Sequence, residues 1–557
     1  MTHPSANPRV LIVTPEVTYL PSGMGNLSNY LSVKAGGVAD VSAGLIRSLF
    51  EQGADVHVAI PDYRKIFRQK LPSIMKKKFD VLRNGLPHDR IHLAKDRSFF
   101  YLDSVSYGCG PKNTKIALNF QREVINSIVP RVQPDLIHCN DWMTGLIPAM
   151  TRQAGIPCLF TIHNTYTEKC SLSFIEDIGI DAASFWENLF YERYPSNYEK
   201  SRDSNPVDFL ASGVFGAHFV NTVSPTFLRE MMEGRHHRVN IHLQRELNNK
   251  WEAGCAAGIL NAPDPSFNPL TDNALFRKYS AKNHYLAKQY NKLFLQEKLG
   301  LVVDSRAPIF FWPSRLDTIQ KGCRLLAEIL YPVVSNYRDQ NLQVVFVADG
   351  EFKKHFKDMV ISHRMNDRVA VCDFEESLSR LAYGASDFVL MPSLFEPCGL
   401  PQMIGPLYGT LPVAYDTGGL HDTVIPMDVH GHTGNGFLFK HHDTTGLFWA
   451  IKEAMGFYNL SQEVKKRQIE RVMIQSAVEF SHHITAQQYI DLYEKMLRRP
   501  LINGQNSHSF GTRKNCGEKN RNAPNTSHSK TYRLISDDSD LQNIIRLSER
   551  KSESLSY

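Results

Sequence analysis

Ser393-Leu-Phe-Glu-Pro-Cys-Gly-Leu-Pro-Gln402 follows the apolar run Asp387-Phe-Val-Leu-Met-Pro392, and together they form the most informative part of the chain. The apolar run is typical of a buried strand in a parallel sheet. The motif after it therefore lies beyond the carboxyl end of that strand, which is the edge where open α/β sheets bind ligands. The sequence thus predicts an α/β fold with a binding site around Glu396.

Two glycine-containing segments extend this motif, Tyr408-Gly-Thr-Leu-Pro412 and Thr417-Gly-Gly-Leu-His-Asp-Thr-Val424. Glycines let backbone N–H groups approach a ligand closely, and a helix N-terminus favours anions. A carboxylate that accepts sugar hydroxyls, beside N–H groups that hold phosphate, suits a nucleotide sugar. Any one glycine is better explained as a break between strand and helix, but the whole ordered string indicates binding. The candidate donor-binding residues in this part of the chain are Glu396, Cys398, Gly399, Leu400, Thr417, Gly418 and Gly419.

In this order, the motifs resemble the donor-site signature of bacterial glycogen synthases and plant starch synthases, and the resemblance runs from about Arg9 to about Arg499. Members of that family are retaining glycosyltransferases with two Rossmann-like domains facing across a cleft, the GT-B architecture. The resemblance implies transfer of glucose from ADP-glucose or UDP-glucose to the nonreducing end of an α-1,4-glucan, such as glycogen or a maltooligosaccharide. ADP-glucose is the donor that the resemblance favours, and it implies neither a cofactor nor a metal.

Length and composition describe a large globular protein. At 557 residues, the chain exceeds the size at which a single core stops growing, so two domains are expected. Hydrophobic residues make up 42% and charged residues 22%, and no apolar run approaches the ~18 residues that cross a membrane. The first residues lack the basic region and apolar core of a signal peptide. We therefore expect a cytoplasmic enzyme with no membrane partner.

The charged residues, cysteines and histidines argue against several other classes of protein. The formal net charge of +6 is diffuse, and no Lys/Arg-rich helix with interleaved aromatics is visible, so no nucleic-acid partner is expected. The nine cysteines are scattered without a CxxC pair, which indicates reduced thiols. No histidine pair completes a recognisable metal spacing, so no metal site is expected.

Apolar runs alternate with helical stretches in two separate series. This alternation predicts parallel βαβ units and hence two Rossmann-like domains. We divide the chain into an N-terminal domain at 9–261, a C-terminal donor-nucleotide domain at 262–480, a crossover helix at 481–499 and a tail at 500–557. The resemblance implies that the crossover helix packs on the N-terminal domain. The tail has no hydrophobic periodicity, so we interpret it as disordered and expect its deletion to leave folding and activity nearly intact.

Lys34-Ala-Gly-Gly-Val-Ala-Asp-Val41 supplies the N-terminal part of the expected donor site. A lysine before paired glycines at a loop-to-helix junction offers phosphate both a cation and N–H groups. The segment resembles the family motif KxGGLADV, which implies donor contacts from Lys34, Gly36, Gly37 and Asp40. A longer loop, 19–33, precedes this motif, and a neutral surface insertion explains it slightly better than a cap over the acceptor.

Two strand ends add residues at the reaction centre. His138-Cys-Asn-Asp-Trp142 and Thr161-Ile-His-Asn164 each contain the end of a predicted strand, so Asp141 and His163 can point into the same cleft. The resemblance implies that Asp141 accepts hydroxyl hydrogen bonds near the reacting sugars and that His163 lines the active site. For Trp142, core packing is a safer expectation than sugar stacking.

The C-terminal domain also supplies two cations, Arg315 and Lys321, in Pro313-Ser-Arg-Leu-Asp-Thr-Ile-Gln-Lys-Gly322. Two fixed cations stabilise the charge that builds on a departing phosphate and can replace a metal. The segment resembles the family motif SRLxxQKG, with one more residue between the two cations. Arg315 and Lys321 are therefore assigned to the donor site. The catalytic set that we predict is His163, Asp141, Glu396, Arg315 and Lys321.

Two alternatives remain open and a third is rejected. A related GT-B enzyme with a small-sugar acceptor would share the donor residues. A catalytically silent glucan- or nucleotide-binding protein would explain departures such as Ala348-Asp-Gly-Glu351, where relatives carry GxGD. A nicotinamide oxidoreductase is rejected because Gly23-Met-Gly25 lies too far beyond Val13 and lacks the third glycine of the fingerprint.

Overall fold

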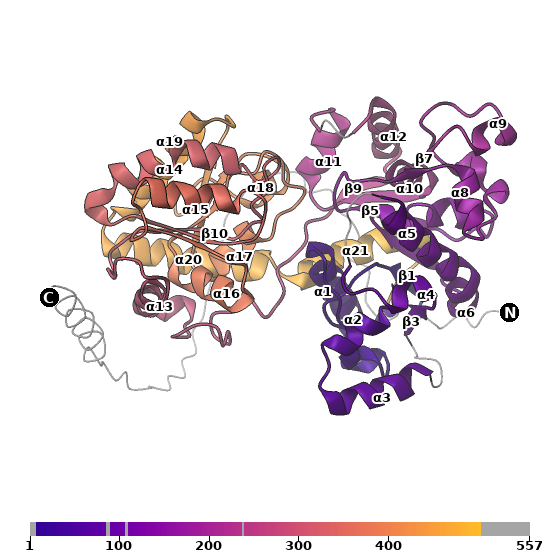
Figure 1. Ribbon diagram of the computed structural model, residues 1–557, viewed down its shortest axis with the longest axis horizontal. Coiled ribbons are helices and arrows are strands. Elements are labelled where there is room, and N and C mark those ends of the chain that lie inside the picture. Colours follow the sequence, from indigo (N-terminus) through magenta and orange to yellow (C-terminus); the bar gives the residue numbers. More distant parts are fainter. Residues whose placement is uncertain (1–6, 85–89, 106–109, 237–238, 503–557) are drawn as a thin grey trace, which may run out of the picture. The chain divides into compact units, whose positions relative to one another are not determined.

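The computed structural model describes residues 7–84, 90–105, 110–236 and 239–502 (Figure 1). Its strands form two parallel sheets, one from the first half of the chain and one from the second. A short antiparallel ribbon of β6 (Lys169–Cys170) and β7 (Val207–Asp208) lies outside both sheets. The α/β class and the two Rossmann-like units expected from the sequence are therefore confirmed.

The first sheet has seven strands in the order β3-β2-β1-β4-β5-β8-β9. Their bounds are β1 (Arg9–Val13), β2 (Asp55–Pro61), β3 (Ile91–Ala94), β4 (Leu136–Asn140), β5 (Cys158–Ile162), β8 (Phe219–Thr222) and β9 (Ala256–Gly258). All of their pairings are parallel. The order runs outward from β1 in both directions, so the carboxyl ends of β1 and β4 meet at a topological switch point, where such sheets bind ligands.

The second sheet repeats this arrangement with six strands in the order β12-β11-β10-β13-β14-β15. Their bounds are β10 (Ile309–Trp312), β11 (Gln343–Val347), β12 (Val369–Cys372), β13 (Phe388–Met391), β14 (Leu411–Tyr415) and β15 (Phe437–Phe439). These pairings are also parallel. The switch point of this sheet therefore lies between β10 and β13.

Helices connect the strands within each unit. Those of the first unit are α1 (Gly37–Glu51), α2 (Arg64–Gln69), α3 (Ser73–Asn84), α4 (Arg97–Phe100), α5 (Pro111–Glu123), α6 (Val129–Val132), α7 (Ile147–Thr151), α8 (Leu172–Asp177), α9 (Tyr198–Arg202), α10 (Phe209–Gly216), α11 (Pro225–Met232) and α12 (Ile241–Glu252). The later helices are α13 (His284–Leu299), α14 (Cys323–Asn336), α15 (Lys353–Ser362), α16 (Glu376–Ala385), α17 (Pro401–Leu407), α18 (Gly418–Thr423), α19 (Thr444–Tyr458), α20 (Gln462–Glu479) and α21 (His482–Leu497).

The second sheet is buried on both faces. Phe310 and Trp312 of β10 belong to one hydrophobic cluster, while Ile309 and Phe311 belong to another. Successive side chains of a strand point to opposite faces of a sheet, so each face packs against its own layer of helices. This double burial explains why the strands are continuous apolar runs in the sequence.

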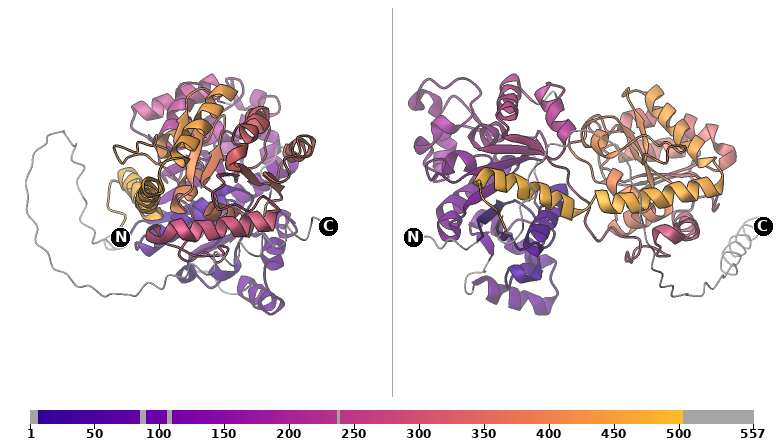
Figure 2. Two further views of the ribbon diagram at one scale, coloured as in Figure 1. Left: turned by 90° about the vertical axis from the view of Figure 1, so that its left-hand side faces the viewer. Right: turned by 180° about the vertical axis from the view of Figure 1, so that it is seen from behind.

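The last described helix, α21, returns to the first unit (Figure 2). Tyr489 and Tyr493 of this helix are buried in the first core. The Tyr493 hydroxyl lies 2.7 Å from Nδ1 of His138 on β4, and the Tyr489 hydroxyl accepts a hydrogen bond of 3.0 Å from Nδ2 of Asn221 on β8. The expected packing of the C-terminal helix on the first domain is confirmed.

The tail does not start at residue 500 as expected, because Leu501 and Ile502 are still packed against the first unit. Both side chains are buried in the core of the first unit, and the Leu501 N–H donates to Glu494 Oε1 at 2.9 Å. The helix α21 ends at Leu497, but the chain stays packed past Pro500 as far as Ile502, so the change in composition at Pro500 placed the boundary too early. The expected tail from residue 503 onward lies outside the described residues.

We predict that Leu501→Ala lowers the free energy of unfolding by about 2–4 kcal/mol, because it leaves a cavity where a fully buried leucine packs. Urea denaturation of the full chain measures the change. Leu286→Ala is the matched control: this leucine on α13 is 58% exposed, so its loss should change stability by less than about 0.5 kcal/mol. Equal effects of the two substitutions would contradict the packing of Leu501.

Candidate active site

The expected site residues follow the carboxyl ends of strands in both sheets. In the second sheet, Arg315 and Lys321 follow β10, and Glu396 follows the neighbouring strand β13. In the first sheet, Asp141 follows β4 and His163 follows β5, which is the next strand along. Each sheet thus carries its candidate residues at or beside its switch point, the edge that binds ligands in this class of fold.

Lys321 and Glu396 form a buried ion pair. Lys321 Nζ lies 2.5 Å from Glu396 Oε2, and the two side chains are only 12% and 8% exposed. Burial lowers the effective dielectric and strengthens this attraction, and removal of either partner would leave an uncompensated charge. The additional residue in the lysine motif therefore does not prevent Lys321 from reaching Glu396. Arg315 is exposed, and no side chain in the described part of the protein pairs with it.

Gly418 and Gly419 let the segment after β14 lie directly on the Glu396 motif. The Gly419 N–H donates to the Glu396 carbonyl oxygen at 2.9 Å. A Cβ atom on Gly418 would lie 2.1 Å from that oxygen, and one on Gly419 would lie 2.0 Å from the Cys398 carbonyl oxygen. Gly418 also has a φ of +45°, which L-residues rarely adopt. Close backbone approach is thus the physical reason for this glycine pair.

Glu230, on α11 of the first unit, contacts the same segment and was not identified from the sequence. Its carboxylate accepts hydrogen bonds from Thr417 Oγ1 at 3.1 Å and from the Gly418 N–H at 3.0 Å, and His236 Nε2 lies 3.2 Å away. Burial raises the pKa of Glu230, but the bonds from His236, Gly418 and Thr417 outweigh it, and the pKa lies below its ordinary value. The Gly418 N–H that we assigned to phosphate is therefore bonded to a carboxylate in this structure.

Asp422, on α18, makes the reciprocal contact with α11. Its carboxylate accepts hydrogen bonds from Ser224 Oγ at 2.5 Å, the Thr226 N–H at 2.9 Å and Thr226 Oγ1 at 2.6 Å. The first turn of a helix has N–H groups without intrahelical partners, and it favours negative charge. Each of these two helices therefore receives a carboxylate from the other at its N-terminus.

In the lysine–glycine motif of the first unit, backbone N–H groups are likewise bonded to a buried carboxylate. The N–H groups of Ala35 and Gly36 donate to Oε2 of the buried Glu16, the second of these at 3.1 Å. Lys34 Nζ lies 2.6 Å from Asp40 Oδ2, with the lysine side chain 49% exposed. Glu16 was also missed by the sequence analysis. The phosphate contacts expected at Lys34 and Gly36, and at Gly37 where α1 begins, stay predictions.

Asp141 combines a strained backbone with a buried carboxyl group. Its φ of 62° and ψ of 177° fall in a region that is essentially restricted to glycine. Burial raises the pKa of Asp141 to about 7, although backbone N–H groups of Trp142, Asn164 and His163 oppose the rise. The group can therefore carry a proton near neutral pH and can donate as well as accept hydrogen bonds. Trp142 is 2% exposed, in agreement with its expected core packing.

His163 is held as a neutral ring. Its Nε2 lies 2.9 Å from Asn140 Oδ1, and Asn140 Nδ2 donates to the Val13 carbonyl at 3.1 Å. With the Asn140 amide in this orientation, His163 Nε2 carries the proton and Nδ1 is left as an acceptor. Burial lowers the pKa of His163 to about 4, so the ring stays uncharged at neutral pH. At neutral pH, His163 Nδ1 can therefore accept a hydrogen bond from a hydroxyl group.

The Cys398-Gly-Leu segment has a mainly structural environment. The Cys398 side chain packs with Val223 and Met403, and burial raises the pKa of its thiol to about 12. Gly399 has a φ of +77°, and Leu400 immediately precedes α17. A donor contact at Cys398 would therefore come from the backbone.

Neither a metal cluster nor a membrane span is found in the described ranges. No three or more His, Cys, Asp or Glu side chains there are grouped to hold a metal ion. No helix of the described residues combines the length and apolar character needed to cross a bilayer. Independence from metals stays a prediction.

Comparisons with known proteins agree with this geometry. Residues 9–244 match the family described as "Starch synthase catalytic domain", and residues 307–456 match "Glycosyl transferases group 1". Glycogen synthase of Thermosipho melanesiensis is 30% identical over 496 residues, covering 85% of this chain and 98% of that protein. Glycogen synthase of Exiguobacterium sibiricum is 33% identical over 487 residues, covering 83% and 96%.

Two solved structures are also similar. The catalytic domain of starch synthase IV from Arabidopsis thaliana, bound to ADP and acarbose, has a TM-score of 0.70 and 25% identity over 89% of this chain and all of that one. Sucrose-phosphate synthase from Thermosynechococcus elongatus, at 19% identity and a TM-score of 0.52, shares the fold.

The fold and the site define a two-domain glycosyltransferase of the GT-B type. The chain belongs to the family of glycogen and starch synthases, and it is a glucosyltransferase of glycogen or starch synthesis. The recognition made from its motifs is confirmed.

We predict that Asp141→Asn stabilises the protein above neutral pH by on the order of 2 kcal/mol. The folded-state pKa of about 7 lies above the ordinary value of 3.8, so this carboxyl contributes stability that is complete below about pH 4 and is lost as the pH rises through 7. Asparagine has no such proton to lose. Urea denaturation at pH 5 and pH 8 should show the advantage of the variant growing with pH, and a constant difference would contradict the raised pKa.

We predict that Glu230→Ala lowers the free energy of unfolding by about 2–3 kcal/mol, because three buried donors lose their acceptor. Glu233→Ala is the matched control, since Glu233 is 42% exposed and pairs at the surface with Arg235. This control should change stability by no more than about 0.5 kcal/mol. If urea denaturation shows no difference between the variants, the contact between α11 and Gly418 does not stabilise the fold.

Proposed function

We propose that this protein transfers glucose from ADP-glucose to the nonreducing end of an α-1,4-glucan, with retention of configuration. The observation that carries the proposal is the buried Lys321–Glu396 pair at the switch point of the second sheet. Family membership supports glucose and glucan as the transferred group and the acceptor. The similar Arabidopsis enzyme is bound to ADP and acarbose, which supports an adenine nucleotide as the donor.

In this proposal, Lys321 stabilises the charge of the leaving diphosphate. As the bond between the glucose C1 atom and the diphosphate oxygen breaks, negative charge builds on that oxygen, and a nearby fixed cation lowers the barrier. Arg315 and Lys34, which are exposed, supply further positive charge to the diphosphate. Glu396 holds Lys321 in place, and its carboxylate orients the hydroxyl groups of the donor.

The first unit supplies neutral hydrogen-bonding groups for the sugars. His163 Nδ1 accepts a hydroxyl of the transferred glucose, because its Nε2 is committed to Asn140. Asp141 binds a second hydroxyl. The acceptor hydroxyl attacks C1 from the face that the diphosphate leaves and gives its proton to the departing phosphate oxygen, so configuration is retained. We assign no step to a metal or cofactor.

The proposal is tested by incubating the protein with glycogen and labelled ADP-glucose or UDP-glucose in parallel. Incorporation from ADP-glucose that exceeds incorporation from UDP-glucose is expected. Incorporation from neither donor would overturn the transfer proposal and favour a silent binding protein. Transfer to small sugars in place of glycogen or maltooligosaccharides would indicate the related small-acceptor activity instead.

We predict that Lys321→Ala lowers kcat by about 100- to 1000-fold, which corresponds to ~2.7–4 kcal/mol of barrier, and changes glucan binding little. The reason is that the ammonium acts mainly when the diphosphate departs. Lys298→Ala, which removes an exposed lysine from the end of α13, is the control and should keep normal kcat. Steady-state kinetics with ADP-glucose measure both variants, and near-normal kcat in Lys321→Ala would exclude this role.

A further inference from the structure

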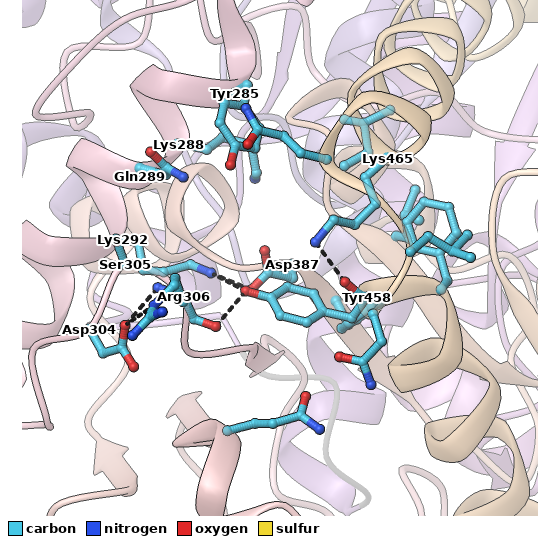
Figure 3. A pocket seen from close by; sticks show the side chains of 18 of the residues that line it. Tyr285, Lys288, Gln289, Lys292, Asp304, Ser305, Arg306, Asp387, Tyr458 and Lys465 are labelled. Atoms are coloured by element: carbon cyan, nitrogen blue, oxygen red, sulfur yellow. Dashed lines mark hydrogen bonds and ion pairs between the residues drawn. The ribbon is translucent and has the colours of Figure 1, made fainter.

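A cavity of about 550 Å³ opens at the other edge of the second sheet (Figure 3). Asp387, Phe388 and Leu411 line it at the amino ends of β13 and β14. Glu396 and Thr417, by contrast, follow the carboxyl ends of these strands. The cavity is therefore separated from the proposed donor site by the length of the strands, and its volume lies in the range of small-molecule sites.

Three lysines line this cavity. Lys288 and Lys292 lie one turn apart on α13, and Lys465 reaches in from α20 on the opposite side. Lys292 Nζ lies 2.6 Å from Asp387 Oδ2, and Asp387 also attracts the other two ammonium groups. Asp387 therefore pairs directly with one lysine and attracts two others.

The pKa values of two of these lysines are lowered, mainly by burial. Burial lowers the pKa of Lys288 to about 7, and Lys292 lowers it further while Asp387 opposes. Burial likewise lowers the pKa of Lys465, again with Lys292 adding to the shift and Asp387 opposing it. A bound anion would stabilise the charged forms of these buried lysines.

Lys465 and Arg306 are the cations with capacity for a ligand. Lys288 already donates to the Tyr408 carbonyl at 3.0 Å and to Thr410 Oγ1 at 2.9 Å. Lys465 Nζ donates to the Tyr458 carbonyl at 2.6 Å, and this is its single hydrogen bond among the described residues. An ammonium has three N–H donors, so two remain without a hydrogen bond there, and the ammonium also lies 4.4 Å from the centroid of the Tyr458 ring. The Arg306 side chain is 91% exposed, with Asp304 3.8 Å away.

The remaining lining residues suit the hydroxyl groups of a sugar. His284 is buried, with Nδ1 2.6 Å from the Ala281 carbonyl, and its Nε2 has no hydrogen-bond partner within the described ranges. Asp304 is held by Asn341, and Asp339 is exposed. The uncharged polar side chains that line the cavity are Tyr285, Gln289, Ser305, Gln340, Asn459 and Gln462. Amides and hydroxyls of this kind both donate to and accept from a sugar.

We propose that this cavity binds a hexose monophosphate, with its phosphate on Lys465 and Arg306 and its hydroxyls on the amide side chains and His284. The inference does not depend on the proposed transfer reaction. A phosphate group is also present in inorganic phosphate and in the nucleotide donor, so the experiment separates these sources.

The test is calorimetric titration of the full chain with glucose 1-phosphate and glucose 6-phosphate. We expect at least one to bind, and Lys465→Gln and Arg306→Gln each to weaken its binding by about tenfold or more, because each removes a charge-assisted contact. Arg467→Gln is the matched control, since this exposed arginine lies on α20 outside the cavity lining. Lys321→Ala should keep full affinity, because it alters only the donor site.

Several outcomes would overturn the proposal. They are no binding of either hexose phosphate to the unaltered chain, unchanged binding in both cavity variants, or binding lost in Lys321→Ala but kept in Lys465→Gln. Equal affinity for inorganic phosphate and for the hexose phosphates would overturn the assignment of the amides to a sugar. Because Arg306 is nearly fully exposed, its replacement leaves folding intact and keeps the test decisive even if Lys465→Gln is unstable.

Discussion

The exchange of carboxylates between α11 and α18 is the interaction on which the arrangement of the second-unit site depends. Glu230 binds the Thr417–Gly418 backbone turn, and Asp422 binds the first turn of α11. The next residue, Gly419, binds the Glu396 carbonyl, and the Glu396 carboxylate in turn holds Lys321. Hydrogen bonds, joined by the backbone between them, therefore connect a helix of the first unit to Lys321 of the second.

Burial gives the two halves of the site opposite electrostatic characters. In the first unit it raises the pKa of Asp141 and lowers the pKa of His163, so both side chains shift toward their neutral forms. In the second unit, Lys321 and Glu396 are buried together as an opposite-charge pair. Neutral groups suit the hydroxyls of a sugar, whereas a fixed cation suits a diphosphate. The same physical effect thus suits the first-unit residues to the proposed sugar recognition and Lys321 to the proposed stabilisation of the leaving group.

The sequence predicted those features that rest on local patterns. Alternating apolar runs and helices predicted both parallel sheets, and the loop motifs identified Lys321 and Glu396, which the fold brings together. Glu16 and Glu230 were missed because their partners lie far away in sequence: Glu230 and Gly418 are 188 residues apart. Lys288 and Lys465 were not identified from the sequence, because lysines on a helix usually cover a solvated face. The boundary at residue 500 was wrong because a proline and a polar composition concealed two buried side chains. All of the assigned donor contacts, those of Lys321 and Glu396 included, stay predictions.

The return of α21 to the first unit affects the order in which the two domains can finish folding during synthesis. All strands of the first sheet come from residues before 259, yet the buried hydroxyls of Tyr489 and Tyr493 bond to strands of that sheet, and Leu501 fills its core. During synthesis, the ribosome must complete the whole second unit before these groups emerge. Until then, His138 and Asn221 of the nascent first domain lack their tyrosine partners. The incomplete domain is exposed to chaperones and proteases during this interval. The domain made first is the one that finishes folding last.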